Sequence, residues 1–114
     1  MIAVIFELEP HAQTAARYFK LAAGLRAALE GIDGFISVER FESLSRPGRY
    51  LSLSFWRDEE AVRRWRCHDP HRSAQQEGRS TVLAGYRLRV ASVVRDYGLL
   101  DRDEAPADSR ETLR

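Results

Sequence analysis

One hairpin pattern in the middle of the chain constrains the fold more than any other feature. Residues 35–44 (FISVERFESL) and 50–56 (YLSLSFW) alternate apolar and polar side chains, which is the pattern of half-buried strands. Ser-Arg-Pro-Gly, a turn sequence, stands between them, so the two strands are predicted to pair antiparallel. The second strand should carry Leu51, Leu53 and Phe55 on one face and Tyr50, Ser52, Ser54 and Trp56 on the other.

A strand and a helix are predicted before this hairpin. Residues 2–9 are rich in β-branched and aromatic side chains and alternate in polarity, which favours a first strand. Pro10 then stands where a helix can begin, because its missing N–H costs nothing at that position. Between residues 11 and 30 the apolar side chains recur every three or four positions, as on one face of a helix: Ala15, Tyr18, Phe19, Ala22, Leu25 and Leu29.

A broken helix and a last strand are predicted after the hairpin. Asp58 is a good N-cap, with two glutamates in the following turn. Asp69-Pro70 repeats the start signal, so a second short helix is expected over residues 70–77. Residues 81–98 read as one long strand, and the chain loses its apolar content from about Asp101. We therefore expect one domain over residues 1–100 and a disordered tail over 101–114.

The predicted order is β-α-β-β-α-β, which is typical of the α+β class with a ferredoxin-like, four-stranded antiparallel sheet and helices on one face. The other face would keep apolar side chains: Ile5, Val93, Phe35 or Ile36, and Leu51 or Tyr50. An uncovered apolar surface of that size is unusual on a monomer. We therefore expect a homodimer that forms through the sheet face.

Charge and cysteine content limit the partners and the compartment. The formal net charge of +1 gives no overall attraction to nucleic acid or to anionic lipid. Cys67 is the single cysteine, which fits a reducing compartment. No apolar run approaches the roughly 20 residues of a membrane helix, and the first residues lack the features of a signal peptide. We expect a cytoplasmic protein that does not bind membranes or nucleic acid.

Three stretches resemble the antibiotic biosynthesis monooxygenase (ABM) family of dimeric α+β barrels. They are YLSLSFWRDEEAVRRWR (50–66), HDPHRSAQQEGR (68–79) and YRLRVASVVRDYG (86–98), and the likeness extends over residues 2–98. The resemblance implies one of three roles. Some members are cofactor-independent monooxygenases that oxidise polycyclic aromatic or quinol-like compounds, some bind and degrade haem, and many have no known activity.

The haem-degrading branch fits this sequence poorly. In that branch a helical tryptophan is followed ten residues later by the histidine that ligates iron, and the first strand carries an asparagine. Trp65 matches the tryptophan, but Gln75 stands at the ligand position and the first strand offers Phe6 and Glu7. Glutamine is a poor haem ligand. Haem degradation is therefore the third of our hypotheses.

Metal and thiol chemistry are also disfavoured. Cys67, His68 and His71 are possible ligands, but Asp69-Pro70 changes the chain direction between the histidines and separates them from one helical face. Cys67 and His68 are neighbours in sequence, and adjacent residues on a helix do not face each other. We predict neither a metal site nor a catalytic cysteine.

The remaining candidate is a pocket for an aromatic ligand between helices and sheet. Its expected lining is Phe6, Phe55, Val62, Trp65, Arg72, Gln75 and Tyr86. His71, near a helix N-terminus, would stay neutral and could deprotonate an acidic phenol, with Arg72 or Tyr86 near the anion. We expect a monooxygenase that uses no cofactor and no metal, and the alternative is a non-catalytic binding or stress-response protein. Arg87, Arg89 and Arg95 form a basic stripe that favours solvent or dimer contacts.

Overall fold

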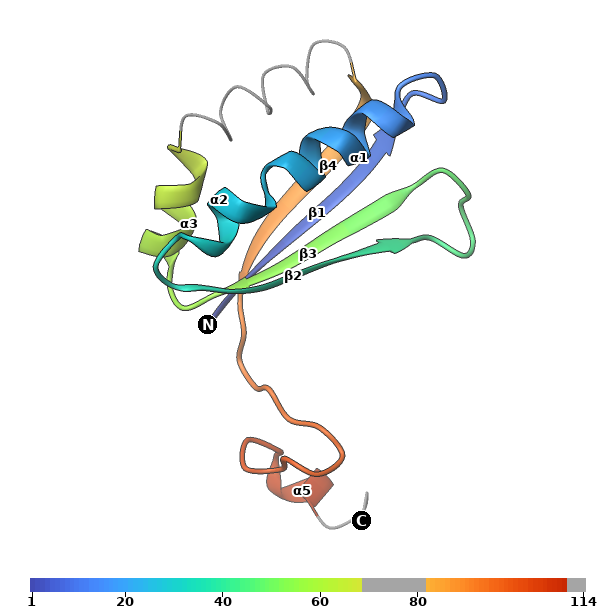
Figure 1. Cartoon of the computed structure of the whole chain (residues 1–114). Helices are drawn as coiled ribbons and strands as arrows, with labels where there is room; N and C mark the ends of the chain where they lie inside the picture. Colours follow the sequence, from blue (N-terminus) through green and yellow to red (C-terminus); the bar gives the residue numbers. More distant parts are fainter. Residues whose placement is uncertain (69–81, 111–114) are drawn as a thin grey trace.

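The computed structural model of the chain describes residues 1–68 and 82–110. Figure 1 shows one sheet with helices along one side and a C-terminal segment that leaves the end of the sheet. The elements in chain order are β1 (Ile2–Pro10), α1 (Ala15–Gly24), α2 (Arg26–Glu30), β2 (Phe35–Glu42), β3 (Tyr50–Trp56), α3 (Glu59–Arg66), β4 (Leu83–Ser92) and α5 (Ala107–Arg110). The second predicted helix, residues 70–77, lies outside the described residues.

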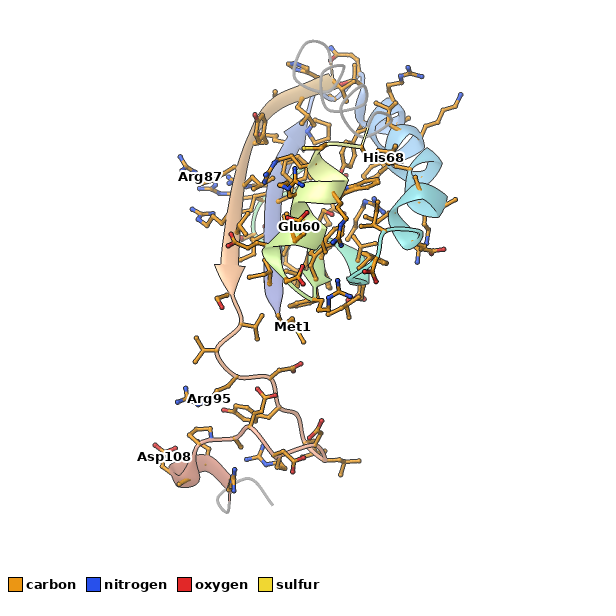
Figure 2. The ribbon with its side chains drawn as sticks, turned by 90° about the vertical axis from the view of Figure 1, so that its left-hand side faces the viewer. Met1, Glu60, His68, Arg87, Arg95 and Asp108 are labelled. Carbon is orange, nitrogen blue, oxygen red and sulfur yellow. The ribbon has the colours of Figure 1, made fainter. Side chains whose placement is uncertain are left out.

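The four strands form one antiparallel sheet in the order β2-β3-β1-β4. The hairpin β2–β3 lies at one edge, and β1 pairs with both β3 and β4 in the middle. Figure 2 shows the sheet from the side, with the helices on one face and Arg87 pointing away from the other. The predicted α+β ferredoxin-like topology is confirmed.

The strand register decides which side chains face the helices. Residues opposite each other in an antiparallel pair point to the same face of the sheet. Phe6 lies opposite Ser52 on β3 and opposite Leu88 on β4, and all three face the helices. The alternate positions, such as Ile5 opposite Leu53, face the other way.

The core lies where α2 and α3 meet the sheet. Leu29, Trp56, Ala61 and Val62 are buried there, and six partly buried apolar side chains pack around them: Ile2, Val4, Ile32, Phe35, Val38 and Trp65. Trp56 is only 1% exposed, and its indole N–H donates to the Ser54 hydroxyl oxygen at 2.9 Å. The ring of Phe35 meets the Trp56 ring edge-on at 5.3 Å. Trp56 therefore joins the end of the sheet to the helical layer.

Gly34 lets the turn before β2 approach α3 closely. Its φ is 94°, a conformation that other residues rarely adopt, and a Cβ added there would lie 2.6 Å from the Cβ of Ala61. Real Cβ atoms do not approach each other so closely, so glycine is required at this position for both reasons.

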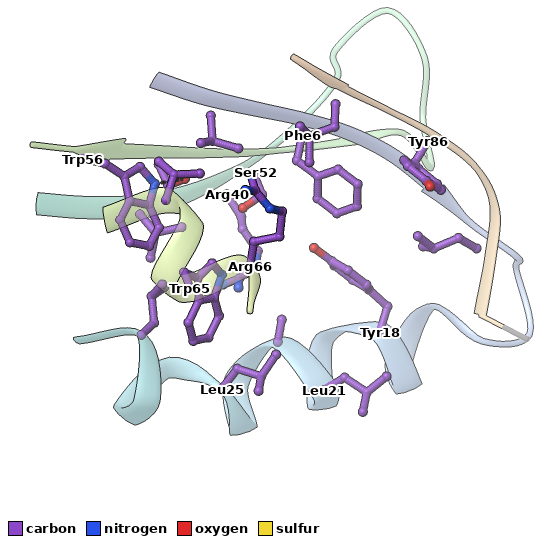
Figure 3. A pocket seen from close by; sticks show the side chains of 18 residues that line it. Phe6, Tyr18, Leu21, Leu25, Arg40, Ser52, Trp56, Trp65, Arg66 and Tyr86 are labelled. Atoms are coloured by element: carbon purple, nitrogen blue, oxygen red, sulfur yellow. Dashed lines mark hydrogen bonds between the residues drawn. The ribbon is translucent and has the colours of Figure 1, made fainter. Parts of the chain in front are cut away.

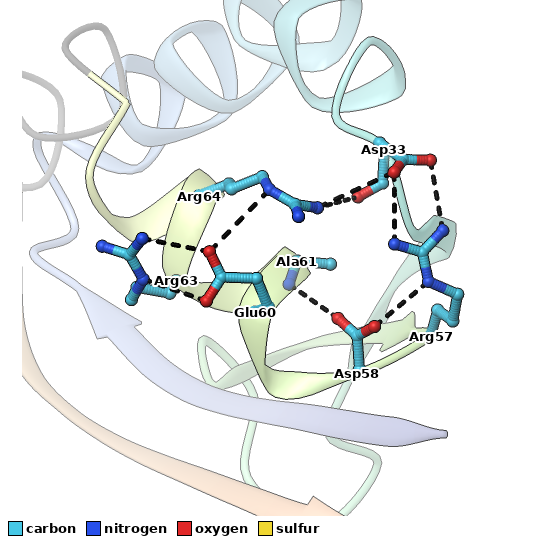
Figure 4. A network of polar contacts seen from close by, with 7 residues as sticks. All are labelled: Asp33, Arg57, Asp58, Glu60, Ala61, Arg63 and Arg64. Atoms are coloured by element: carbon cyan, nitrogen blue, oxygen red, sulfur yellow. Dashed lines mark hydrogen bonds and ion pairs between the residues drawn. The ribbon is translucent and has the colours of Figure 1, made fainter.

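Ion pairs on the outer surface hold α3 in place (Figure 4). Asp58 caps the helix by accepting a hydrogen bond from the Ala61 N–H at 2.9 Å, as predicted. This bond, together with the neighbouring Arg57 guanidinium, holds the pKa of Asp58 below its usual value. Arg57 also forms two hydrogen bonds with Asp33, each of 3.2 Å, which lower the pKa of Asp33. These charges are exposed, so they orient α3 without forming a buried polar site.

The first helix begins later than predicted and is divided. Pro10 belongs to β1 and lies opposite Leu83, and the following turn is tied to β4 because the Thr14 hydroxyl donates to the Val82 carbonyl at 2.7 Å. The helix therefore starts at Ala15. Gly24 ends α1, and Leu25 separates α1 from α2. Pro10 was wrongly interpreted as a helix start because Pro also suits the end of a strand that lies beside a bulge.

The last strand ends six positions earlier than predicted, at Ser92 instead of residue 98. One further bond joins the Val93 N–H to the Met1 carbonyl at 2.9 Å, where β1 begins. Beyond it the chain leaves the sheet and forms a turn and α5, with the Arg110 guanidinium donating to the carbonyl oxygens of Ala105 and Asp103. Regular structure therefore appears within the tail that we expected to be disordered. In the described part of the chain no helix is long and apolar enough to cross a membrane.

Candidate functional site

A cavity of about 210 Å³ lies between the helical layer and the sheet (Figure 3). Every described element except α5 contributes to its wall. The lining side chains are Val4, Phe6, Tyr18, Leu21, Ala22, Leu25, Leu29, Val38, Arg40, Ser52, Ser54, Trp56, Val62, Trp65, Arg66, Leu83, Tyr86 and Leu88. Most of them are apolar or aromatic, as in cavities that bind small molecules.

The periodicity of the elements explains this lining. The inward positions are Tyr18, Leu21 and Ala22 on α1 and Leu25 directly after it, at the three- and four-residue spacing of one helical face. On β1, β2 and β3 every second side chain reaches the cavity, so β3 contributes Ser52, Ser54 and Trp56. Two serines in the wall leave space that larger side chains would fill. The cavity thus follows from small side chains on the sheet opposite a row of leucines.

A few polar groups interrupt the apolar wall. Arg40 on β2 lies opposite Ser52 on β3, so both side chains project from the same part of the sheet. Tyr18 projects from α1, with its hydroxyl directed into the space between helix and sheet (Figure 3). Burial raises the pKa of Tyr18. A hydrogen bond that the Arg40 guanidinium donates to the Tyr18 oxygen, together with the positive charge of Arg40, lowers this pKa by a smaller amount. A tyrosine hydroxyl is protonated at neutral pH even at its ordinary pKa, so Tyr18 can donate a hydrogen bond to a ligand.

Aromatic contacts shape two ends of the cavity. Phe6 and Tyr86 meet edge-on with 5.7 Å between ring centroids, at the β4 side. On α3, the Trp65 ring stacks against the His68 ring, with centroids 5.8 Å apart and 20° between the planes. These rings offer flat apolar surfaces on which a cyclic or conjugated ligand can pack.

Phe6, Trp65 and Tyr86, which we predicted as pocket residues, lie in the cavity wall. Phe55 does not, and that prediction was wrong. Its partner across β1 is Ala3, and both face away from the helices. The strand pattern alone does not decide which face of β3 points to the cavity. The prediction assigned the cavity to the face of Leu51, Leu53 and Phe55. The structure places Trp56 there instead.

Three further predicted site residues, His71, Arg72 and Gln75, lie outside the described residues. Cys67, beside them in sequence, is exposed. Within residues 1–68 and 82–110, no three His, Cys, Asp or Glu side chains gather in a way that could hold a metal ion.

Tyr18, Arg40, Ser52, Ser54 and Arg66 are the polar lining residues that sequence reasoning missed. Tyr18 stood in the predicted apolar stripe of the first helix, where its hydroxyl was the available signal. Arg40 was harder to find. The pairing of β2 with β3 shifts between Phe35 and Ser37, so simple alternation from the start of the strand gives the wrong face.

The opposite face of the sheet carries apolar side chains and a group of ion pairs. Glu7 accepts hydrogen bonds from Arg49 at 3.1 Å and from Arg89 at 3.0 Å. Arg87 lies on this face too, whereas Arg95 follows the end of β4 and does not continue the predicted stripe. Larger apolar side chains on this face include Ile5, Phe41, Leu51, Leu53 and Phe55.

Comparison with known protein sequences shows which family and which relative the chain resembles. The profile of a family described as "Antibiotic biosynthesis monooxygenase" matches residues 1–77. A Pyricularia oryzae protein named jasmonate monooxygenase ABM is 52% identical over 93 residues, which are 82% of this chain and 43% of that protein. The chain thus spans less than half the length of this curated relative.

Solved structures agree in fold. A putative antibiotic biosynthesis monooxygenase from Deinococcus radiodurans superposes with a TM-score of 0.77 at 18% identity, covering 86% of this chain and 97% of that one. A variant of SnoaB, a cofactor-independent oxygenase from Streptomyces nogalater, gives a TM-score of 0.71 at 14% identity, covering 83% and 94%. At these identities the likeness concerns the fold alone. Together with the profile match over residues 1–77, it leads to one conclusion: the chain belongs to the antibiotic biosynthesis monooxygenase family.

Proposed function

We propose that this chain is a monooxygenase that binds a small, mostly apolar molecule in the cavity and oxidises it with dioxygen. The observation that carries the proposal is the cavity of about 210 Å³, walled by leucines and by the rings of Phe6, Trp65 and Tyr86. The name of the 52% identical relative supports the same class of reaction and suggests a jasmonate-type substrate. An aromatic or quinol-type compound, expected from the sequence, fits the same wall.

The proposed oxidation requires a source of electrons and a base in the cavity. We propose that no metal, flavin or haem takes part, so a quinol-type substrate must itself supply both electrons that reduce one oxygen atom to water. Loss of a proton makes an electron-rich ring a better electron donor, and a base in an apolar, water-poor cavity favours that step. A saturated carbon cannot supply these electrons, so hydroxylation of jasmonate would consume an added reductant.

His71 remains our proposed base, as predicted from the sequence. The Tyr18 hydroxyl, which lines the cavity, is suited to stabilise the resulting oxyanion by donating a hydrogen bond. Trp65 supplies a flat surface on α3 that would hold the ring of the substrate against the sheet.

Dioxygen consumption tests the proposal. The purified chain is mixed with a naphthoquinol, and separately with jasmonate with and without ascorbate, after treatment with a chelator. We expect dioxygen uptake and a product that contains one oxygen atom from ¹⁸O₂. His71→Ala should slow turnover by about 10²- to 10⁴-fold, the usual contribution of a general base.

His11→Ala is the matched control, because His11 is exposed in the turn before α1 and does not line the cavity. It should turn over like the unchanged chain. Tight binding of these compounds with no dioxygen uptake would contradict the monooxygenase and favour the non-catalytic binding protein.

We further propose that two copies pair through the sheet face that carries no helix. In the described part of the chain the helices lie on one side of the sheet (Figure 2). Ile5, Leu51, Leu53 and Phe55 lie together on the opposite side. A second copy presenting the same face would bury these side chains symmetrically, as in most homodimers.

Sedimentation velocity at micromolar concentration should give a species of about twice 13.1 kDa. Leu53→Glu should dissociate it, because the new carboxylate would replace an apolar contact and would lie opposite Glu39, a group of like charge on β2. Leu44→Glu, at a fully exposed loop position, should leave the dimer intact. A monomeric unchanged chain would contradict the proposal.

A further inference from the structure

We propose that the cavity recognises an anionic group on an otherwise apolar substrate, and that Arg40 is the residue that binds this group. The inference rests on the proposed function, since it names the substrate class of the same site. It assigns a carboxylate, or an equivalent oxyanion, to one position in the cavity, with the apolar body of the substrate against the leucines and aromatic rings.

The arginines of this chain differ in whether they form ion pairs. Six arginines have a carboxylate partner in the described structure: Arg26, Arg49, Arg57, Arg63, Arg64 and Arg89. Arg40, an exposed residue that lines the cavity, differs from them, and it shares this feature in the described structure with Arg66, the other arginine of the cavity wall. Among residues 1–68 and 82–110, no carboxylate pairs with Arg40, and no Asp or Glu side chain lines the cavity. The site therefore presents a positive charge without an internal counterion.

Arg40 lies among other hydrogen-bond donors. Its guanidinium can offer two parallel N–H donors to a carboxylate. Ser52 lies opposite it on β3, and the Tyr18 hydroxyl comes from α1 to the same part of the cavity. Three donors from three different elements therefore converge, and each can donate to an oxygen atom of a ligand.

The rest of the cavity wall contrasts with this polar position. Leu21, Leu25 and Leu29 line the helical side, and Val4 and Phe6 line the sheet beside them. An anion held by Arg40 would leave such an apolar body in contact with these side chains. The wall thus favours amphipathic acids over neutral hydrocarbons and over small polar anions.

Binding measurements on matched pairs of ligands test the inference without requiring turnover. The pairs are jasmonate with its methyl ester and 2-naphthoate with its methyl ester, titrated by calorimetry against the full chain without reductant. Each pair shares one carbon skeleton and differs in charge. The unchanged chain should bind each acid about 10- to 100-fold more tightly than its ester, the range expected for a charged hydrogen bond.

Arg40→Gln should remove this preference, because it should weaken the binding of the acid and leave the binding of the ester nearly unchanged. Arg46→Gln removes the same charge from the exposed β2–β3 loop and should keep the preference. Arg66→Gln tests the other arginine of the wall. Thermal unfolding of each variant shows whether a loss of binding comes from a loss of folding. If Arg40→Gln is unfolded, Arg40→Lys replaces it in the test; this variant keeps the charge and must retain part of the acid preference.

Equal binding of acid and ester by the unchanged chain would overturn the inference, as would no binding of either pair. A preference that survives Arg40→Gln but disappears in Arg66→Gln would assign the anion to Arg66 and overturn the role of Arg40. Acid-selective binding without dioxygen uptake would contradict the proposed monooxygenase alone, so the two failures are distinguishable.

Discussion

Replacing Trp56 with alanine is expected to lower the free energy of unfolding by about 3–5 kcal/mol, the usual cost of removing a large buried aromatic side chain. Trp56 is 1% exposed, contacts the ring of Phe35, and joins the end of β3 to α2 and α3. Alanine would remove these contacts and leave the Ser54 hydroxyl without its indole donor. The surrounding residues come from several elements, so they cannot all move inward to fill the space.

Urea unfolding followed by circular dichroism, at one fixed protein concentration, measures this change. Leu44→Ala is the control, because Leu44 is fully exposed and its replacement should change the free energy by less than about 0.5 kcal/mol. Trp56→Phe should be milder than Trp56→Ala, since it keeps a ring against Phe35. A loss for Trp56→Ala as small as that for Leu44→Ala would mean that the core is misplaced.

The topology could be predicted from the sequence because each element carries its own signal. The Ser-Arg-Pro-Gly turn predicts the hairpin, and Asp58 with the acidic residues after it marks the start of α3. A chain of this order has few ways to bury one face of a four-stranded sheet. Local patterns were therefore sufficient for the order and pairing of the strands.

Element boundaries needed tertiary information. Pro10 is compatible both with the start of a helix and with the end of a strand. The hydrogen bond from the Thr14 hydroxyl to the Val82 carbonyl favours the end of the strand. That bond joins residues 68 positions apart, so no local pattern reports it. The end of β4 also depends on a distant contact, because Ser92 pairs with Ile2 at the start of β1.

The cavity wall was predictable only in part. Phe6 and Trp65 follow from strand alternation and from the apolar stripe of α3. Phe55 was placed on the wrong face because both faces of β3 carry large apolar side chains, and hydrophobicity alone does not choose between Phe55 and Trp56. The face to which Arg40 points depends on a shift in the pairing of β2 and β3, and no sequence pattern predicts this shift.

Filling the cavity is expected to have the largest effect on ligand binding. Ala22 lines the cavity from the last turn of α1, whereas Ala23, the next residue, is exposed. A tryptophan at position 22 would direct an indole into a space of about 210 Å³ and leave little room for a ligand. A tryptophan at position 23 would point to solvent. The two variants have the same composition, so general effects of the substitution cancel in the comparison.

Calorimetric titration of the two variants with 2-naphthoate tests most directly whether this cavity is the binding site. Circular dichroism and thermal unfolding first establish that both variants are folded. Ala22→Trp should show no measurable binding, and Ala23→Trp should bind with the affinity of the unchanged chain. If a folded Ala22→Trp binds as tightly as Ala23→Trp, the ligand occupies another place and the function proposed for the cavity is wrong.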